Sequence, residues 1–156
     1  ARGISVDASL RTSAAEVFAA GDAAEFPSAL SGQPIRQETW LNAETQAHVA
    51  AQNMLGGDAL YTQAPWFWSD QYDHQLQVSG EPALGTHSIT RALGEGDQIT
   101  FYLDAGQRLV GMSGWGLASR TAREFKLART LVEKLVSASP AALADPGIKL
   151  KSLLSA

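Results

Sequence analysis

The sequence has 156 residues, of which 45% are hydrophobic and 18% charged, and its formal net charge is −4. This composition suffices for a globular core, and the absence of cysteine excludes disulfides, cysteine-based zinc or iron–sulfur sites and a dithiol redox pair. No apolar run approaches the roughly 20 residues that span a bilayer, and residues 1–12 have no signal-peptide pattern, so we expect a cytoplasmic protein with no membrane partner. We also expect no nucleic-acid partner.

The first part of the chain predicts short strands. The alternating segment 3–13 indicates a strand or strand pair, with Ile4 and Val6 pointing inward. The apolar run 16–20 indicates a buried strand, and the Gly-Asp pair at 21–22 indicates the turn that follows it. Because the first residue is not methionine, we interpret the chain as a fragment or a processed product.

A helix is predicted over residues 42–55. Asn42 is a suitable N-cap, and Gly56 and Gly57 supply the signal that ends the helix. The segment is rich in alanine, so its inner face allows another element to approach closely. Residues 56–65 then indicate a linker.

Beyond the linker the pattern predicts an antiparallel sheet. The expected strands follow one another with short turns, and residues 104–106 (Asp-Ala-Gly) carry a hairpin signal. These strands are expected at 74–80, 88–94, 98–104 and 108–116.

The last part of the chain has a helical period. Thr121 and Glu124 have the spacing of a capping box, and Pro140 is expected to end the helix. One or two short helical turns are expected over 140–154. The apolar face is expected to cover the sheet, which gives an α+β fold; it comprises Phe125, Ala128, Leu131, Val132 and Leu135.

Charge is distributed unevenly along the chain. Residues 119–156 contain seven basic and three acidic side chains (+4), whereas residues 1–118 contain five basic and thirteen acidic ones (−8). A basic end on an acidic body indicates an anionic partner, although a helix face that is basic only for solubility has the same pattern. The candidate docking residues are Arg120, Arg123, Lys126 and Lys134.

One group of residues suggests a metal site. Asp70, Asp73 and His74, with Glu81 and His87 further on, have the oxygen and imidazole groups that bind a divalent ion. The cluster leads into a strand and does not follow a helix face, so we interpret these residues as hydrogen-bonding groups and expect no metal. A Ser–His–Asp triad is not expected either, because the chain has no nucleophile elbow.

Two further interpretations remain. The aromatic run 66–68 and the basic helix fit a docking surface without catalysis. Alternatively, Asp22 follows an apolar run at the position where open α/β sheets bind ligands, and its carboxylate suits sugar or ribityl hydroxyls. Trp40 lies close to a predicted helix N-terminus, whose N–H groups and positive dipole end suit a flat anionic ring.

Three motifs resemble one known family. "VFAAGD" at 17–22, "RQETWLNAETQ" at 36–46 and "PWFWSDQ" at 65–71 look like the C-terminal part of the FAD-dependent ferredoxin reductases. These reductases serve Rieske dioxygenases and cytochrome P450 systems; biphenyl dioxygenase and putidaredoxin reductases belong to them, and apoptosis-inducing factor is a more distant relative. The resemblance extends over nearly the whole chain.

The resemblance implies a set of FAD-binding residues. Asp22 would bind the ribityl chain, Trp40 would lie at the pyrimidine end of the flavin, and Trp68 would lie beside the isoalloxazine. Gly21 and Ala43 are implied as further FAD contacts. No side chain is expected to be a covalent or acid–base catalyst, and we interpret Trp66 and Phe67 as core residues.

The chain departs from the family because it contains no G-x-G-x-x-G unit for FAD or NAD(P)H. We therefore expect residues 1–58 to be the C-terminal remnant of an α/β FAD-binding domain, and 59–156 to be the interface domain. The complete enzyme would pass electrons from NAD(P)H through FAD to an iron–sulfur ferredoxin. The chain alone would be inactive without its N-terminal part; the alternative is a non-catalytic docking module like the C-terminal domain of apoptosis-inducing factor.

Overall fold

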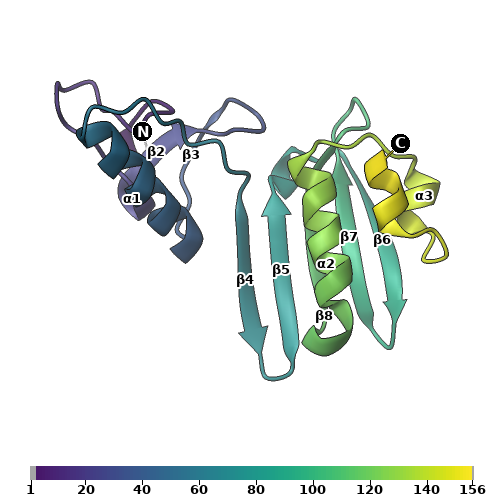
Figure 1. The fold of residues 1–156 in the computed structure, drawn as a ribbon. Helices are drawn as coiled ribbons and strands as arrows, with labels where there is room; N and C mark the ends of the chain where they lie inside the picture. Colours follow the sequence, from purple (N-terminus) through teal and green to yellow (C-terminus); the bar gives the residue numbers. More distant parts are fainter. Residues whose placement is uncertain (1–2, 156) are drawn as a thin grey trace. The chain divides into compact units, whose positions relative to one another are not determined.

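The computed structural model describes residues 3–155 and contains two compact units, Ala1–Phe67 and Trp68–Ala156 (Figure 1). The boundary between the two units lies between residues 67 and 68. The predicted division at residue 58, between a remnant of the FAD-binding domain and an interface domain, stays a prediction. In the described part of the chain no helix is both long and apolar enough to cross a membrane.

The first unit combines a small sheet with one helix. Its strands are β1 (Ile4–Ser5), β2 (Ala24–Pro27) and β3 (Pro34–Ile35), in the order β1-β2-β3, and its helix is α1 (Trp40–Met54). β1 is parallel to β2, and β2 is antiparallel to β3. A small core is shared by the sheet, the helix and the linker; it comprises Val6, Leu10, Ala24, Phe26, Ala50 and Tyr61.

The predicted strand at 16–20 is wrong. Its backbone pairs only with an irregular segment, through Thr12 N to Val17 O and Ala19 N to Leu10 O, so a single bridge between Arg11 and Phe18 forms and no ladder develops. The regular strand is β2, which comes after the Gly-Asp pair and not before it. The prediction for the first segment is half right, because Val6 is buried while Ile4 is 51% exposed.

Helix α1 begins earlier than predicted. Its N-cap is Thr39, whose extended backbone (φ −129°) precedes the first helical residue and whose Oγ1 accepts a hydrogen bond from Asn42 N at 3.4 Å. The predicted cap, Asn42, is inside the helix and buried. The predicted end is confirmed, since Gly56 follows the helix with a left-handed φ of +87°.

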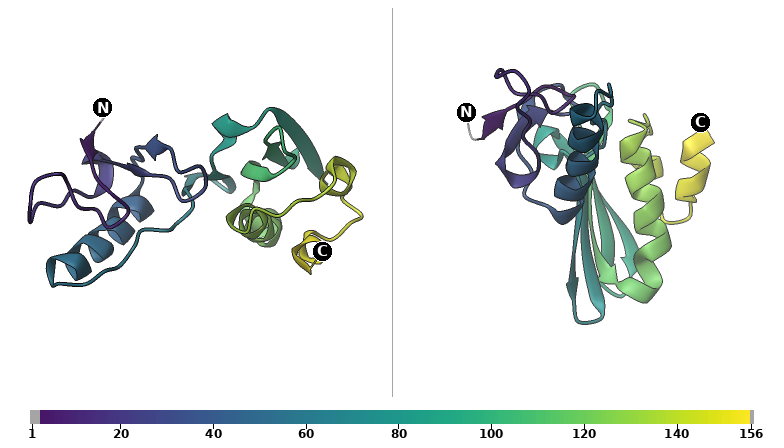
Figure 2. Two further views of the ribbon diagram at one scale, coloured as in Figure 1. Left: turned by 90° about the horizontal axis from the view of Figure 1, so that it is seen from above. Right: turned by 60° about the vertical axis from the view of Figure 1, so that its left-hand side comes forward.

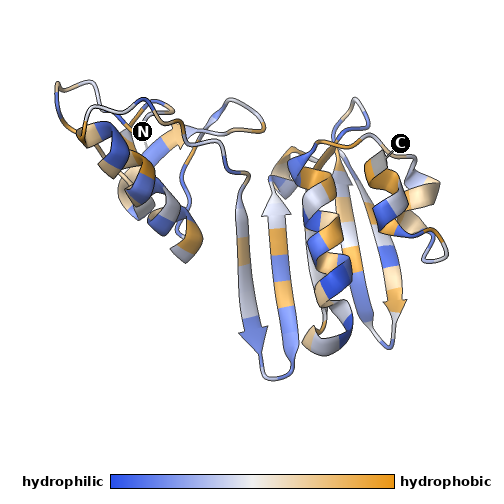
Figure 3. Cartoon of the chain, in the orientation of Figure 1, coloured by the Kyte–Doolittle hydropathy of each residue, from blue (hydrophilic) through white to orange (hydrophobic). Residues whose placement is uncertain are grey.

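The second unit is an antiparallel sheet with a helix on one face (Figures 1 and 2). The strand order is β4-β5-β8-β7-β6, and β5 alternates hydrophilic and hydrophobic residues along its length (Figure 3). The α+β class and the four predicted strands are confirmed. The elements are β4 (Trp66–Gln71), β5 (His74–Gly80), β6 (His87–Gly94), β7 (Asp97–Leu103), β8 (Leu109–Leu117), α2 (Ala118–Glu133) and α3 (Pro140–Ala144), with 3₁₀ turns at Pro82–Leu84 and Leu150–Ser155.

Strand β4 was not predicted, and it carries the aromatic run. Phe67 is 40% exposed, so its interpretation as a core residue is wrong, whereas Trp66 is half-buried. The reason is position: β4 is the edge strand of the sheet order, so it has a strand neighbour on only one side.

Helix α2 lies directly against β8 because β8 carries glycines where the helix crosses it. A Cβ on Gly114 would lie 2.7 Å from Phe125, and one on Gly116 would lie 2.6 Å from Thr121. The predicted apolar face is buried at Phe125, Ala128, Leu131 and Val132. Only Leu135 lies outside the helix.

The predicted capping box and the predicted end of this helix are both wrong. Thr121 is buried within α2, and its Oγ1 donates to Leu117 O at 3.0 Å, so it forms no capping box. The helix ends at Glu133, because Leu135 has a left-handed φ of +47° and Val136 N donates to Leu131 O. Pro140 instead begins α3, where Ser139 is the N-cap.

Candidate functional site

The Gly-Asp pair forms a 3₁₀ turn that packs against helix α1. Gly21 is buried with φ +70°, and a Cβ at this position would lie 3.3 Å from the Ala43 side chain. Glycine is favoured here because it allows both the left-handed backbone and the close approach to the helix. The structure therefore brings Gly21, Asp22 and Ala43 together, and it leaves the Asp22 side chain exposed.

Two side chains hold this turn through its backbone. Gln46, which is fully buried on α1, accepts a hydrogen bond from Gly21 N through its Oε1 at 2.8 Å. Arg36 donates from Nη1 to Asp22 O at 3.2 Å and also pairs with Glu38 at 2.5 Å. The carboxylate of Asp22 is thus presented from a turn whose N–H and carbonyl groups are both engaged.

The N-terminus of α1 lies next to the same turn. Trp40 is the first helical residue and is 67% exposed, and no acidic side chain occupies the first turn of the helix. The first N–H groups of a helix have no intrahelical acceptor and carry partial positive charge. An exposed carboxylate and a helix N-terminus together suit a ligand that combines hydroxyl groups with a flat, electron-rich ring.

Helix α1 presents buried amides to the loops around it. Asn42 donates from Nδ2 to Gln37 O and accepts from Tyr61 Oη. Asn53 binds three backbone groups: its Nδ2 donates to Ser9 O and Ala59 O, and its Oδ1 accepts from Ala59 N, each at 2.8 Å. The linker is therefore attached to α1 at two points before the chain reaches β4.

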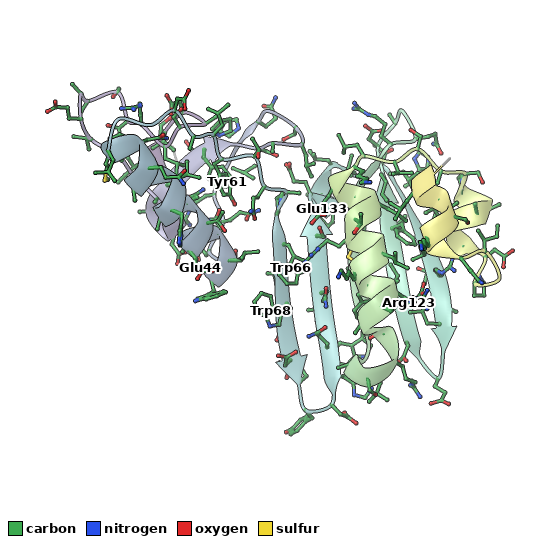
Figure 4. All side chains as sticks on the ribbon, in the orientation of Figure 1. Glu44, Tyr61, Trp66, Trp68, Arg123 and Glu133 are labelled. Atoms are coloured by element: carbon green, nitrogen blue, oxygen red, sulfur yellow. The ribbon has the colours of Figure 1, made fainter. Side chains whose placement is uncertain are left out.

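Trp68 belongs to the second unit. It lies on β4 and is 38% exposed. Figure 4 shows Trp68 and Trp66 on the same strand. The structure therefore groups four of the five predicted FAD contacts, Gly21, Asp22, Trp40 and Ala43, within the first unit. The role predicted for Trp68 stays a prediction.

The basic residues of α2 are not equivalent. The guanidinium of Arg120 pairs with Glu95 and, at 2.9 Å, with the buried carboxylate of Asp97. The hydrogen bond from Arg120, and then that from Leu117 N, lowers the pKa of Asp97. Arg123, Lys126 and Lys134 are exposed, as is Arg120, and Figure 4 shows Arg123 on the helix.

The acidic and histidine residues near the β4–β5 turn form hydrogen bonds. His74 Nδ1 lies 2.7 Å from Asp73 Oδ1, and this contact lowers the pKa of Asp73. The His74 ring stacks on Trp115 with 5.3 Å between centroids. Within residues 3–155 no group of three potential metal ligands comes together.

Sequence reasoning missed Gln46, Arg36 and Tyr61 as parts of this site. A signal was present for the first: Asn42, Gln46 and Asn53 recur on one side of α1 at helical spacing, among alanines. Amides at helical spacing in an alanine-rich segment indicate a helix whose inner face hydrogen-bonds to loops.

The chain is similar to proteins of one known family. The profile of the family described as "Reductase C-terminal" matches residues 66–154. The chain is 38% identical to the ferredoxin–NAD(+) reductase component of the anthranilate 1,2-dioxygenase system of Burkholderia cepacia, covering 97% of this chain and 37% of that protein. It is 36% identical to the corresponding component of the biphenyl dioxygenase system of Paraburkholderia xenovorans, covering 100% and 37%.

A solved structure agrees with these matches. The crystal structure of the covalent putidaredoxin reductase–putidaredoxin complex aligns with a TM-score of 0.85 and 30% identity, covering 98% of this chain and 36% of that one. The chain thus spans little more than a third of the length of the relatives it matches.

Proposed function

The chain belongs to the reductase C-terminal family, and from this membership we propose that it is the C-terminal part of an FAD-dependent NAD(P)H:ferredoxin reductase. The observation that carries the proposal is the Gly21–Asp22 turn packed against the N-terminal half of α1. The named ferredoxin reductases among the relatives support the same activity for the complete protein.

The residues of the first unit fit an FAD molecule. Asp22 would accept hydrogen bonds from ribityl hydroxyls, and its exposure leaves the carboxylate accessible. Gly21 and Ala43 would line the same place, and the N-terminus of α1 beside Trp40 would stabilise negative charge on the pyrimidine ring. Trp68 stays a proposed flavin contact on the resemblance alone.

When bound, FAD would accept two electrons as a hydride from the nicotinamide and pass them one at a time to an iron–sulfur ferredoxin. The residues of this chain bind and orient the cofactor, and none of them acts as a covalent or acid–base catalyst. Because the chain lacks a G-x-G-x-x-G unit, tight binding of FAD requires the N-terminal part of the protein.

We also propose that the exposed basic residues on and directly after α2 form a docking face for the ferredoxin. Arg123, Lys126 and Lys134 are exposed on or directly after α2, where an acidic partner would be attracted by charge. The sequence also predicts Arg120 as a docking residue. Its ion pairs with Asp97 and Glu95 compensate its charge, so it should attract an acidic partner less strongly than the other three.

The visible absorption spectrum of the purified complete protein tests the proposal. Flavin bands, together with NAD(P)H-dependent reduction of an iron–sulfur ferredoxin, are expected. A protein without flavin bands would contradict the proposal and favour a docking module of the kind found in apoptosis-inducing factor.

A further inference from the structure

Gln46 connects the two elements of the proposed flavin site. Its Oε1 accepts the hydrogen bond from Gly21 N at 2.8 Å, across 25 residues of sequence, and both residues are buried. Gly21 directly precedes Asp22, and Gln46 lies one helical turn after Ala43. A single side chain therefore links the turn that presents Asp22 to the helix that begins at Trp40.

The other end of the same amide has no partner. Because a backbone N–H only donates, the oxygen of Gln46 must face Gly21, which assigns the second position to the amino group. This Nε2 is buried and forms no hydrogen bond within the described residues. A buried donor without an acceptor is destabilising, so Gln46 contributes less to stability than a fully bonded amide.

Asn53 provides the contrast on the same helix. It is also buried, but both ends of its amide are bonded, to Ser9 O, Ala59 O and Ala59 N. Asn53 thus has the bonding expected of a structural amide. Gln46 holds Gly21 through its oxygen, while its amino group is left without an acceptor.

We propose that Gln46 is a positioning residue for FAD: it sets the place of the Asp22 carboxylate relative to the N-terminus of α1. This inference rests on the proposed function. Without the bond, the turn keeps its contact with Ala43 and the hydrogen bond from Arg36 to Asp22 O, but it loses the hydrogen bond that joins Gly21 N to helix α1. The Asp22 carboxylate and the N-terminus of α1 would then no longer be held at a fixed distance from each other. FAD affinity depends on both groups, because one would bind the ribityl chain and the other the flavin ring.

The test compares three variants of the complete protein. Gln46→Met keeps a side chain of similar length and removes both the acceptor and the unpaired donor. Asn53→Leu removes the fully bonded amide. Gln52→Met makes the same exchange of glutamine for methionine at an exposed position of α1. FAD affinity is measured by flavin fluorescence after removal and re-addition of FAD, and the melting temperature is measured without FAD.

Gln46→Met is expected to weaken FAD binding about tenfold, the scale of one hydrogen bond, and to shift the flavin absorption bands while the melting temperature changes little. Asn53→Leu is expected to lower the melting temperature and leave FAD affinity unchanged, and Gln52→Met to change neither. Should Gln46→Met not fold, Gln46→Asn is the second variant. Its side chain is one methylene shorter, so its oxygen no longer reaches Gly21 N, and FAD binding is expected to weaken likewise.

Unchanged FAD affinity and spectrum in the Gln46 variants would overturn the inference alone, as would an equal loss of affinity in Asn53→Leu. A wild-type protein that binds no FAD would overturn the proposed function as well.

Discussion

The hydroxyl of Tyr61 donates a 3.0 Å hydrogen bond to Asn42 Oδ1, and both residues are buried. The ring of Tyr61 also packs edge-to-face on Phe26, with 5.2 Å between centroids. This pair attaches the linker to the first turn of α1, the same turn that begins with Trp40.

Tyr61 is expected to make stability depend on pH at the alkaline end. Burial raises the pKa of Tyr61 from 10.0 to about 12. Because the folded pKa is higher than the unfolded one, this contribution is complete below pH 10 and is lost as the pH rises toward 12. Urea unfolding of wild type and Tyr61→Phe measures the effect: the variant should be less stable by about 1–2 kcal/mol at pH 8, because Asn42 Oδ1 loses its donor. The difference should shrink between pH 10 and 12, and a constant difference would contradict this account.

Arg120 is expected to stabilise the start of α2 through Asp97. The Asp97 carboxylate accepts hydrogen bonds from Leu117 N and Arg120 Nε, at 3.0 and 2.9 Å. Arg120→Gln leaves this buried carboxylate without its cation, so the melting temperature should fall by roughly 5 °C.

The same variant should change acid unfolding. The folded pKa of Asp97 is lowered, so its contribution is present above the unfolded pKa and is lost as the pH falls through the folded value. Loss of Arg120 should move the midpoint of acid unfolding to higher pH, as followed by circular dichroism. Arg123→Gln, an exposed position on the same helix, is the control, and equal shifts in both variants would argue against the role of the pair.

Arg91 is expected to hold the C-terminal segment. Its buried guanidinium donates to four carbonyl oxygens, those of Leu143, Asp145, Pro146 and Ile148. Arg91→Met leaves these acceptors unpaired and should destabilise the protein by about 3–5 kcal/mol. Hydrogen exchange should increase first over residues 140–155, while the exposed control Arg108→Met should leave that segment protected.

The isolated chain is expected to bind FAD weakly or not at all. It contains the carboxylate and the helix N-terminus that we propose for FAD binding, but no glycine-rich unit for the ADP moiety. Isothermal titration should give tight binding only when the N-terminal part of the protein is supplied. Micromolar or tighter affinity of the chain alone would refute this prediction.

Charge reversal on α2 is expected to slow the reaction with ferredoxin. In the complete reductase, Arg123→Glu combined with Lys126→Glu should raise KM or lower the on-rate for an acidic ferredoxin and leave ferricyanide reduction unchanged. The wild-type rate should also fall with salt, because the Debye length decreases from ~10 Å at 0.1 M to ~3 Å at 1 M. Lys149→Glu with Lys151→Glu is the control of equal charge, and an equal effect there would show that α2 is not a specific dock.

Local signals account for the parts of the fold that were predicted. Strands β5, β6 and β7 have alternating sequences, and turn residues separate β5 to β8. Gly56 ends α1 by a backbone conformation that glycine favours. Strand β4 lacked such a signal, because three aromatic residues in succession do not alternate. Its conformation depends on pairing with β5, which local pattern does not reveal.

Helix ends were predicted less well than helices. Both Thr39 and Asn42 are good N-caps, and so is Thr121, but an N-cap needs an extended backbone as well as a suitable side chain. Tertiary contacts decided between them: Asn42 became buried by binding Tyr61, and Thr121 by packing beneath Gly116.

The sequence by itself determined the family and the alternation of strands β5 to β7, because motifs and periodicity are local properties of a chain. The FAD contacts that it implies, Gly21, Asp22, Trp40 and Ala43, stay a prediction. The tertiary structure alone decided which partner each buried polar group has. Gln46 binds a backbone group 25 residues away, and Arg120 pairs with Asp97, which lies 23 residues away in the sequence. Such pairings arise because a polar group removed from water must bond to whichever group the packing brings within reach, and that neighbour is set by the whole fold.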